Sequence, residues 1–395
     1  MQDRNHLARV STTHEVNVIE NGLIDIPMLQ ILQPDGSVHK EAVAPELDQE
    51  TATKMYNTMA YIRVLDERMV AAQRQGRISF YLASTGEEAA AVGSAAALSD
   101  NDMIMSQYRE QGALAYRGYT TEQFMNQMFS NQKDPNKGRQ MPIHYGDKPL
   151  NFMTISSPLG TQIPQASGYA YGQKMAGKDA VTICYFGEGA ASEGDFHAGL
   201  NMAAVLNCPA IFFCRNNGYA ISTPSDEQFA GDGIASRGLG YGIKTIRVDG
   251  NDILAVYAAT KLARELALKD ECPVLIEAMT YRLAAHSTSD DPTGYRSREE
   301  EDKWRAKDPI KRMEKWLESK GWFDEKAAQK LLEQTRQDVL AAVKLAEKID
   351  VPPIEDLVND VYSEVPWHLK DQLEQLKSHI RQYPDVYPKT SGRIK

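Results

Sequence analysis

Val181-Thr-Ile-Cys-Tyr-Phe186 and Ala210-Ile-Phe-Phe-Cys214 decide the fold of this chain, because each is a short apolar run with a polar turn directly after it. Gly187-Glu-Gly189 follows the first run, and Arg215-Asn-Asn-Gly-Tyr219 follows the second. Between them, residues 194–206 have the apolar spacing of a helix. This order predicts two parallel strands joined by a crossover helix. Polar side chains then lie at the carboxyl ends of the strands, where open α/β sheets bind ligands.

Glu188 and Asn217 are candidate ligands of a magnesium ion, since they lie just beyond the ends of these two strands. Mg²⁺ prefers oxygen ligands and often shares them with substrate phosphates. Glu188 offers a carboxylate, Asn217 a side-chain oxygen and Tyr219 a backbone carbonyl. The small residues after Glu188 let the backbone approach a diphosphate, and the N-terminus of the next helix favours the anion. An ordinary glycine turn is the alternative interpretation of Gly-Glu-Gly taken alone.

The composition is that of a globular protein and disfavours several functional classes. The 395 residues are 42% hydrophobic and 25% charged, with a formal net charge of −10. The sequence has no strongly basic stripe, which disfavours nucleic-acid binding. No apolar run reaches the roughly 18 residues that a membrane span needs. The four cysteines form no CxxC pair, so we expect neither disulfides nor a structural zinc site.

The first residues, Met1-Gln-Asp-Arg-Asn-His6, lack the apolar core of a signal peptide. Acidic residues appear by Glu15, which is unusual for a transit peptide. We therefore expect a cytoplasmic protein of bacterial type, with the mitochondrial matrix as the alternative for a mature chain.

Further strand candidates extend the pattern at Met103–Ser106, Thr245–Val248 and Val274–Ala278, with a crossover helix at 255–268. Alternating strands and helices predict an α/β fold with a parallel sheet covered by helices on both faces. We divide the chain into an N-terminal arm at 1–50, a main domain at 51–305 and a C-terminal helical appendage at 306–395.

Other segments are assigned from local pattern. The arm is expected to hold a strand at 26–32 and a turn at Pro34-Asp-Gly36. Residues 281–302 are expected to form a polar loop. Further helices are expected at 51–75, 86–98, 166–176 and 366–382, with two more at 309–348 that break at Gly321.

Four more positions are candidate ligand contacts. Tyr108 and Arg109 follow the strand at 103–106, where they either contact a diphosphate or complete a turn. Arg215 either pairs with a phosphate through two N–H groups or forms a surface salt bridge. His286, in the polar loop, either moves a proton near neutral pH or is simply solvated.

The loop Ile155-Ser-Ser-Pro-Leu-Gly-Thr-Gln162 precedes a helix of small residues. Its carbonyls and hydroxyls either hold a monovalent cation or cap that helix.

The spacing of Gly187-Glu-Gly189 and Asn217 resembles the thiamine diphosphate signature, Gly-Asp-Gly followed by Asn, with Glu188 in place of Asp. From Ile24 to Tyr387 the chain resembles the alpha subunits of the first, decarboxylating component of branched-chain 2-oxo acid dehydrogenases, and that subfamily has the glutamate form. The similar blocks are Gln75–Tyr81, Gly138–Gly146, Tyr185–Asp195, Phe213–Thr223 and His286–Asp291.

The resemblance implies roles for individual residues. It implies a Mg²⁺ site made by Glu188, Asn217 and Tyr219. It implies contacts with thiamine diphosphate from Tyr108, Arg109, Ser157, Leu159, Gly189, Ala190, Arg215 and His286. It implies a K⁺ site made by Ser156, Pro158, Thr161 and Gln162. It implies phosphorylation positions at Ser287 and Ser297.

The resemblance also implies the reaction and the partners. A branched 2-oxo acid, such as 3-methyl-2-oxobutanoate from valine catabolism, loses CO₂. Its acyl group passes reductively to the lipoyl group of a dihydrolipoyl transacylase, with His286 donating or steering a proton. Only the diphosphate half of a thiamine site is found here. A beta subunit is therefore expected to supply the other half in an α2β2 heterotetramer. Phe80 and Tyr81 are expected near the acyl pocket.

Three alternatives remain open from the sequence. In the first alternative, the chain is the alpha subunit of a pyruvate or acetoin dehydrogenase. In the second, it is a non-catalytic regulatory or scaffold subunit with the same fold. A nucleotide-binding Rossmann protein is a weaker alternative, because GxGxxG does not follow the first strand.

Overall fold

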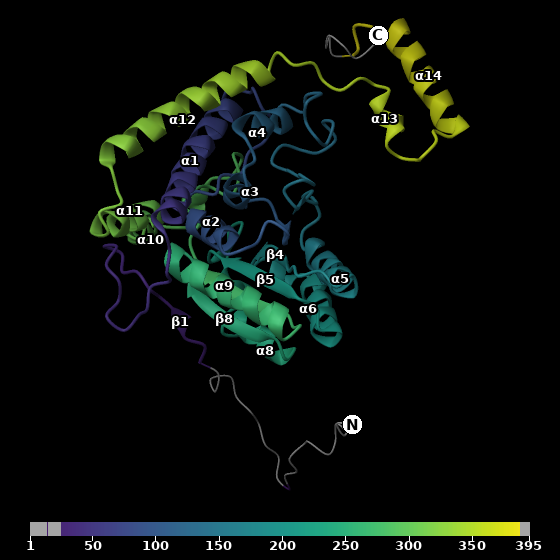
Figure 1. Cartoon of the computed structure of the whole chain (residues 1–395). Helices are drawn as coiled ribbons and strands as arrows, with labels where there is room; N and C mark the ends of the chain where they lie inside the picture. The colour runs from purple at the N-terminus through teal and green to yellow at the C-terminus, as the bar shows by residue number, and fades with distance from the viewer. Residues whose placement is uncertain (1–13, 15–24, 388–395) are drawn as a thin grey trace.

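The computed structural model describes residue 14 and residues 25–387 (Figure 1). Most of the first half of the predicted arm, and the N-terminal segment on which the expected compartment depends, lie outside the described residues. Among those that are described, no helix combines the length and apolarity that crossing a bilayer requires.

A seven-stranded sheet forms the centre, and every pairing in it is parallel, which confirms the predicted sheet. In spatial order its strands are β1 (Met28–Leu29), β8 (Lys244–Asp249), β9 (Val274–Met279), β5 (Ala210–Asn216), β4 (Thr182–Gly187), β2 (Met103–Met105) and β3 (Phe152–Met153). β4 and β5 lie side by side near the middle, with Gly187 opposite Arg215. Both strands therefore end at the same level.

Helices cover both faces of this sheet, as predicted (Figure 1). Alternate side chains of β5 point to opposite faces. Ile211 and Phe213 join a cluster with helices α1 (Gln49–Arg74), α2 (Glu88–Ala96) and α9 (Ile253–Lys269). Phe212 and Cys214 join the opposite cluster, with α5 (Gln162–Met175) and α6 (Gly194–Leu206). Burial on two faces explains why the strands are continuously apolar.

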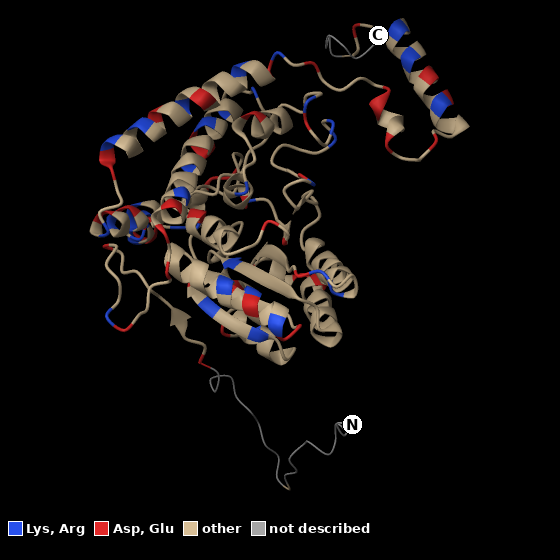
Figure 2. Ribbon diagram, in the orientation of Figure 1, with Lys and Arg blue, Asp and Glu red and all other residues tan. Residues whose placement is uncertain are grey.

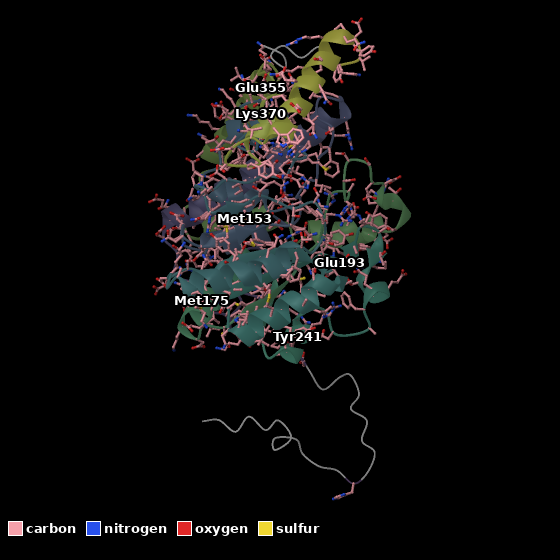
Figure 3. All side chains as sticks on the ribbon, turned by 90° about the vertical axis from the view of Figure 1, so that its right-hand side faces the viewer. Met153, Met175, Glu193, Tyr241, Glu355 and Lys370 are labelled. Carbon is pink, nitrogen blue, oxygen red and sulfur yellow. The ribbon has the colours of Figure 1, made fainter. Side chains whose placement is uncertain are left out.

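Figure 3 shows the side of the molecule that carries α5 and α6. Met175 at the end of α5 is 68% exposed, and Glu193 immediately precedes α6. The helix predicted at 194–206 has the bounds of α6.

Several short elements were not predicted. They are α3 (Gln111–Tyr116), α4 (Thr121–Met128), β3 (Phe152–Met153), β6 (Tyr219–Ala220), β7 (Thr223–Pro224), α7 (Ser225–Gln228), α8 (Ala235–Gly240), α13 (Asp356–Asn359) and the 3₁₀ turns Ala190–Ser192 and Pro292–Gly294.

The arm reaches the sheet edge through β1, which is shorter than the predicted strand at 26–32. The predicted turn is present, because the N–H of Gly36 donates to the carbonyl of Gln33. Asp252, at the start of α9, accepts the backbone N–H groups of Ile31 and Leu32 at 2.7 and 2.6 Å. This buried carboxylate fastens the arm to the main domain.

The polar loop is shorter than predicted, because α10 (Arg298–Arg305) begins inside it. The Ser297 hydroxyl accepts the N–H of Glu300, and three glutamates occupy the first turn. Both features stabilise a helix N-terminus. The expected loop therefore ends at residue 297.

The C-terminal helices are α11 (Pro309–Ser319), α12 (Glu325–Ala346), α13 (Asp356–Asn359) and α14 (Trp367–Gln382). The break predicted at Gly321 is confirmed. Met313 and Trp316 of α11 are buried in the same cluster as α1, whereas α13 and α14 stand apart from the sheet (Figure 1). In Figure 2, charges of both signs occur along α12 and α14.

Candidate functional site

The structure brings Glu188 and Asn217 together at the carboxyl ends of β4 and β5. The N–H of Asn217 donates to Oε2 of Glu188 at 3.2 Å, and both side chains are buried. The N–H of Tyr219 donates to Oδ1 of Asn217 at 3.2 Å. Hydrogen bonds therefore link all three residues that are expected to bind magnesium, across the ends of the two strands.

One carboxylate oxygen of Glu188 is available to bind a metal ion. Its Oε1 is buried and has no hydrogen-bond partner among the residues that the structure describes. Burial raises the pKa of Glu188 to about 7. A buried carboxylate oxygen without a donor is costly unless a cation or a proton meets it. The donor set therefore fits a magnesium ion.

Gly189 allows close approach of the backbone at this turn. A Cβ atom added to Gly189 would lie 2.7 Å from the Cβ of Ala220. Ala190 follows and is buried at the start of a 3₁₀ turn before α6. The turn is therefore compact, and any side chain at position 189 would push the turn away from Ala220.

No group of three or more His, Cys, Asp or Glu side chains arranged to hold a metal occurs in the part of the chain that the structure describes. The expected ligand set of one carboxylate, one amide and one backbone carbonyl contains only one such side chain and is not a group of that kind.

Tyr108 and Arg109 lie in a turn held by the buried Glu110, whose Oε2 accepts the N–H groups of Gln107 and Tyr108. The Arg109 guanidinium donates to the carbonyl of Ala83 at 2.5 Å and to that of His286 at 2.6 Å. Arg109 therefore joins three separate segments at the candidate site.

Arg215 forms buried ion pairs, so the alternative of a surface salt bridge is wrong. Its Nε donates to Glu110 at 2.5 Å, and its Nη1 donates to Glu87 at 3.1 Å. Burial alone would raise the pKa of Glu87, but Arg215 and Arg109 lower it below its usual value. Two of the Arg215 donor groups are thus already used by glutamates.

His286 is half-buried, and its backbone N–H donates to the carboxylate of Asp290 at 2.7 Å. The ring meets Tyr108 edge-on, with centroids 6.3 Å apart, and Nδ1 lies 3.2 Å from Nη2 of Arg109. Burial, reinforced by the positive charges of Arg109 and Arg282, lowers the pKa of His286 to about 4. With this pKa the imidazole is neutral at pH 7.

The loop at 155–162 brings Ser156, Pro158 and Thr161 together. The Thr161 hydroxyl lies 3.0 Å from Oγ of Ser156 and 3.1 Å from the carbonyl of Pro158. Gln162 instead donates to the carbonyl of Tyr185 at 3.0 Å. The Thr161 side chain does not cap α5, whereas the carbonyl of Gly160 in this loop accepts the N–H of Ile163 at 3.0 Å.

Other expected site residues are placed as follows. Ser157 contacts Nε2 of His144 at 2.9 Å, and the Leu159 side chain is 42% exposed. Ser287 accepts the N–H of Ser289, and Ser297 caps α10. These last two serines act locally within their own loop or helix end.

Sequence reasoning missed Glu87, Glu110 and His144, which all contact expected site residues. A signal was present for Glu87, because charged residues beside an Ala-rich core helix are buried only when they are paired. Tyr81, expected near an acyl pocket, is instead fully buried and donates to Asp66 at 2.7 Å.

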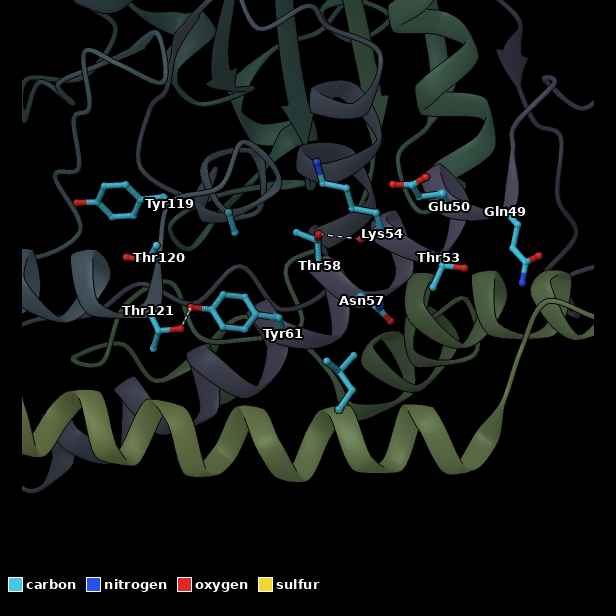
Figure 4. A pocket seen from close by; sticks show the side chains of 12 residues that line it. Gln49, Glu50, Thr53, Lys54, Asn57, Thr58, Tyr61, Tyr119, Thr120 and Thr121 are labelled. Atoms are coloured by element: carbon cyan, nitrogen blue, oxygen red, sulfur yellow. Dashed lines mark hydrogen bonds between the residues drawn. The ribbon is translucent and has the colours of Figure 1, made fainter.

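One cavity borders the expected site residues, and a second cavity lies away from them. One, of about 760 Å³, is bordered by Asn217 and Tyr219. Another, of about 1000 Å³, opens between α1 and α12 and is lined by polar side chains such as Asn57 and Tyr61 (Figure 4). None of the expected site residues lines this second cavity.

Comparison with known proteins identifies the family. Residues 56–355 match the family described as dehydrogenase E1 component. The mitochondrial 2-oxoisovalerate dehydrogenase subunit alpha of Mus musculus is 52% identical over 369 residues, covering 93% of this chain and 84% of the relative. The Homo sapiens protein of that name is 52% identical, covering 93% and 83%. Subunit alpha 1 of Arabidopsis thaliana, also mitochondrial, is 49% identical over 382 residues, covering 96% and 81%. With most of its length matched, this chain belongs to the dehydrogenase E1 component family.

Proposed function

We propose that this chain is the alpha subunit of a thiamine diphosphate-dependent branched-chain 2-oxo acid dehydrogenase. Such an enzyme decarboxylates 2-oxo acids from valine, leucine and isoleucine catabolism. It then transfers the acyl group to the lipoyl group of a transacylase. The observation that supports this most is the pairing of Glu188 and Asn217 at adjacent strand ends in a chain 52% identical to 2-oxoisovalerate dehydrogenase alpha subunits.

Glu188, Asn217 and Tyr219 would hold Mg²⁺. The unpartnered Oε1 of Glu188 supports this assignment. Ser156, Pro158, Thr161 and Gln162 would hold K⁺, supported by the convergence of the Ser156 and Thr161 hydroxyls with the Pro158 carbonyl.

Contacts with the diphosphate cofactor are proposed for Tyr108, Arg109, Ser157, Leu159, Gly189, Ala190, Arg215 and His286. When bound, thiamine diphosphate supplies a nucleophilic carbon and an electron sink for decarboxylation. Arg215 keeps its Nη2 for an anion, since Nε and Nη1 already donate to glutamates.

His286 would move a proton through Nε2. The guanidinium of Arg109 only donates, so Nδ1 of His286 is the acceptor in their 3.2 Å contact. The ring proton of the neutral form then resides on Nε2. This N–H is oriented by Arg109 and is available to donate a hydrogen bond to the lipoyl sulfur, which would steer a proton there during acyl transfer.

The partners follow from the half-site. A beta subunit would complete it in an α2β2 heterotetramer, and a lipoyl-bearing dihydrolipoyl transacylase would accept the acyl group. A cytoplasmic location is also proposed, although the relatives are named as mitochondrial.

Phosphorylation at Ser287 would place a dianion close to Asp290 and Asp291, which would repel it and disorder the loop. Ser297, the cap of α10, is the second proposed position.

The deciding experiment combines the chain with its cognate beta chain. Calorimetry should show Mg²⁺-dependent thiamine diphosphate binding, and 3-methyl-2-oxobutanoate should turn over faster than pyruvate or acetoin. Asn217→Ala should raise the Mg²⁺ requirement steeply, whereas Asn201→Ala, on the exposed face of α6, should not. His286→Ala should keep cofactor binding and lose lipoyl acylation. Absence of cofactor binding by the wild-type pair would refute the proposal and favour a scaffold subunit.

A further inference from the structure

Glu87 is a buried carboxylate for which the reaction gives no role. It immediately precedes α2 but does not cap that helix. Only 1% of its surface is exposed, and its N–H is held by the carbonyl of Ser84 at 2.9 Å. Its side chain extends instead to the carboxyl ends of β4 and β5, where it meets Asn217 and Arg215.

The contact with Asn217 selects which amide atom faces Glu87. Nδ2 of Asn217 donates to Oε1 of Glu87 at 3.1 Å. An ionised carboxylate only accepts hydrogen bonds, so the amide nitrogen must face Glu87 and the amide oxygen must face the other way. On that other side, Oδ1 already accepts the N–H of Tyr219 at 3.2 Å and has a second lone pair. The rotated amide would present N–H groups, which no cation binds.

The same carboxylate also fixes two arginines. Oε1 accepts Nη1 of Arg215 at 3.1 Å, and Oε2 lies 3.8 Å from Nε of Arg109. Oε2 has no hydrogen-bond partner among the described side chains and backbone groups. One buried anion therefore holds an amide and two guanidinium groups that come from three different segments.

We infer that Glu87 is a positioning residue that turns the oxygen of Asn217 toward the metal and holds Arg109 and Arg215 beside it. This inference rests on the proposed function, because it concerns the same Mg²⁺–diphosphate site.

Its neighbour Glu88 provides a matched control. Glu88 is equally buried and is also paired with an arginine, but it binds Arg63 at 2.7 Å and the N–H of Gly86 at 2.8 Å. Arg63 in turn pairs with Asp308, away from the strand ends. The two glutamates thus have the same chemistry and burial and differ in what they orient.

An exchange of amide and carboxylate tests the inference with little change of shape. Asn217→Asp places a second carboxylate against Glu87, and like charges at this distance repel. We expect the Mg²⁺ affinity at saturating thiamine diphosphate, measured by calorimetry on the assembled alpha and beta chains, to fall by about tenfold or more. In the double variant Glu87→Gln with Asn217→Asp, the amide at 87 donates to the carboxylate at 217. We expect this to restore part of the lost affinity and not all of it, because the nitrogen that replaces Oε1 can no longer accept Nη1 of Arg215.

Glu88→Gln combined with Asn217→Asp should give no recovery. Melting of the unliganded assembly should confirm that each variant is folded. Failure of Glu87→Gln to rescue Asn217→Asp, rescue by Glu88→Gln, or unchanged affinity in Asn217→Asp alone would each overturn the inference. Absence of Mg²⁺-dependent binding in the wild-type assembly would instead overturn the proposed function.

Discussion

Removing the carboxylate of Asp66 is expected to loosen the segment that carries Glu87. Asp66 lies on α1, is 1% exposed, and accepts the Tyr81 hydroxyl at 2.7 Å and the N–H and hydroxyl of Ser84 at 2.7 and 3.0 Å. Ser84 in turn holds the N–H of Glu87, and the carbonyl of Ala83 accepts from Arg109. One side chain on α1 therefore anchors the path from the core to the candidate site.

The magnitude follows from the groups left without partners. Asp66→Ala leaves three buried donors without an acceptor, and each costs about 1–3 kcal/mol, so the free energy of unfolding should fall by about 3–9 kcal/mol. Asp66→Asn keeps one oxygen and should cost about 1–3 kcal/mol.

The effect also depends on pH, with a sign set by burial. Burial raises the pKa of Asp66 from 3.8 to about 7 in the folded chain. Its contribution to stability is therefore fully present below the unfolded pKa and is lost as the pH rises through about 7. At about 1.4 kcal/mol per pKa unit, the loss amounts to about 4 kcal/mol.

Thermal melting of wild type, Asp66→Asn and the exposed control Asp371→Asn should be compared between pH 5 and pH 8. The stability advantage of wild type over Asp66→Asn should shrink by several degrees as the pH rises, and Asp371→Asn should follow wild type throughout. A difference that stays constant with pH would refute the assignment of Asp66 as a buried group that is protonated in acid.

Three further outcomes are expected. Asp252→Ala leaves four backbone N–H groups without acceptors and should strongly lower the melting temperature. The control Asp324→Ala removes an exposed helix cap worth about 1 kcal/mol and should lower it far less. Equal effects of the two variants would contradict the anchoring role of Asp252. NMR of labelled His286, whose pKa is lowered to about 4 by burial and by Arg109, should show a neutral ring from pH 5.5 to 8, and a protonation midpoint near 6.5 would contradict this. Chelation of Mg²⁺ should lower the melting temperature of the alpha–beta assembly when thiamine diphosphate is present and leave it unchanged when the cofactor is absent; an equal drop in both would place the metal elsewhere.

The sheet and the pairing of Glu188 with Asn217 could be predicted because both depend on local pattern. The apolar runs at 181–186 and 210–214 have no charged position on either face, which indicates burial on both sides. Once two such strands are parallel neighbours, the residues just beyond their ends must meet. No knowledge of distant side chains is needed for either step.

The partners of Arg215 could not be predicted in the same way. The sequence places Arg215 at the correct strand end, but its glutamates come from positions 87 and 110. Nothing in the local pattern at those positions shows that they point to one spot. The pKa of His286 could not be predicted for a related reason. It depends on burial and on Arg109, which is brought close only by folding.

The start of α10 was missed although its signal was available. Ser297 followed by Glu299, Glu300 and Glu301 is a helix start with acidic residues in the first turn. The low apolar content of this segment suggested a loop, yet helix ends are set by capping as well as by apolar spacing.

The buried charges suggest why the metal and the diphosphate should bind together. Arg109, Arg215 and Arg282 face Glu87, Glu110 and Glu188, and all six side chains are buried. The formal charges cancel when every glutamate is ionised, so a diphosphate entering alone would bring uncompensated negative charge into a site of low dielectric constant. A divalent cation bound by Glu188 and Asn217 would offset much of that charge and would also give the unpartnered Oε1 of Glu188 a ligand. Binding should therefore be strongly cooperative: each of Mg²⁺ and thiamine diphosphate should tighten the binding of the other by the same factor. Independent binding of the two would mean that the arginines serve the diphosphate directly and that their glutamate partners release them.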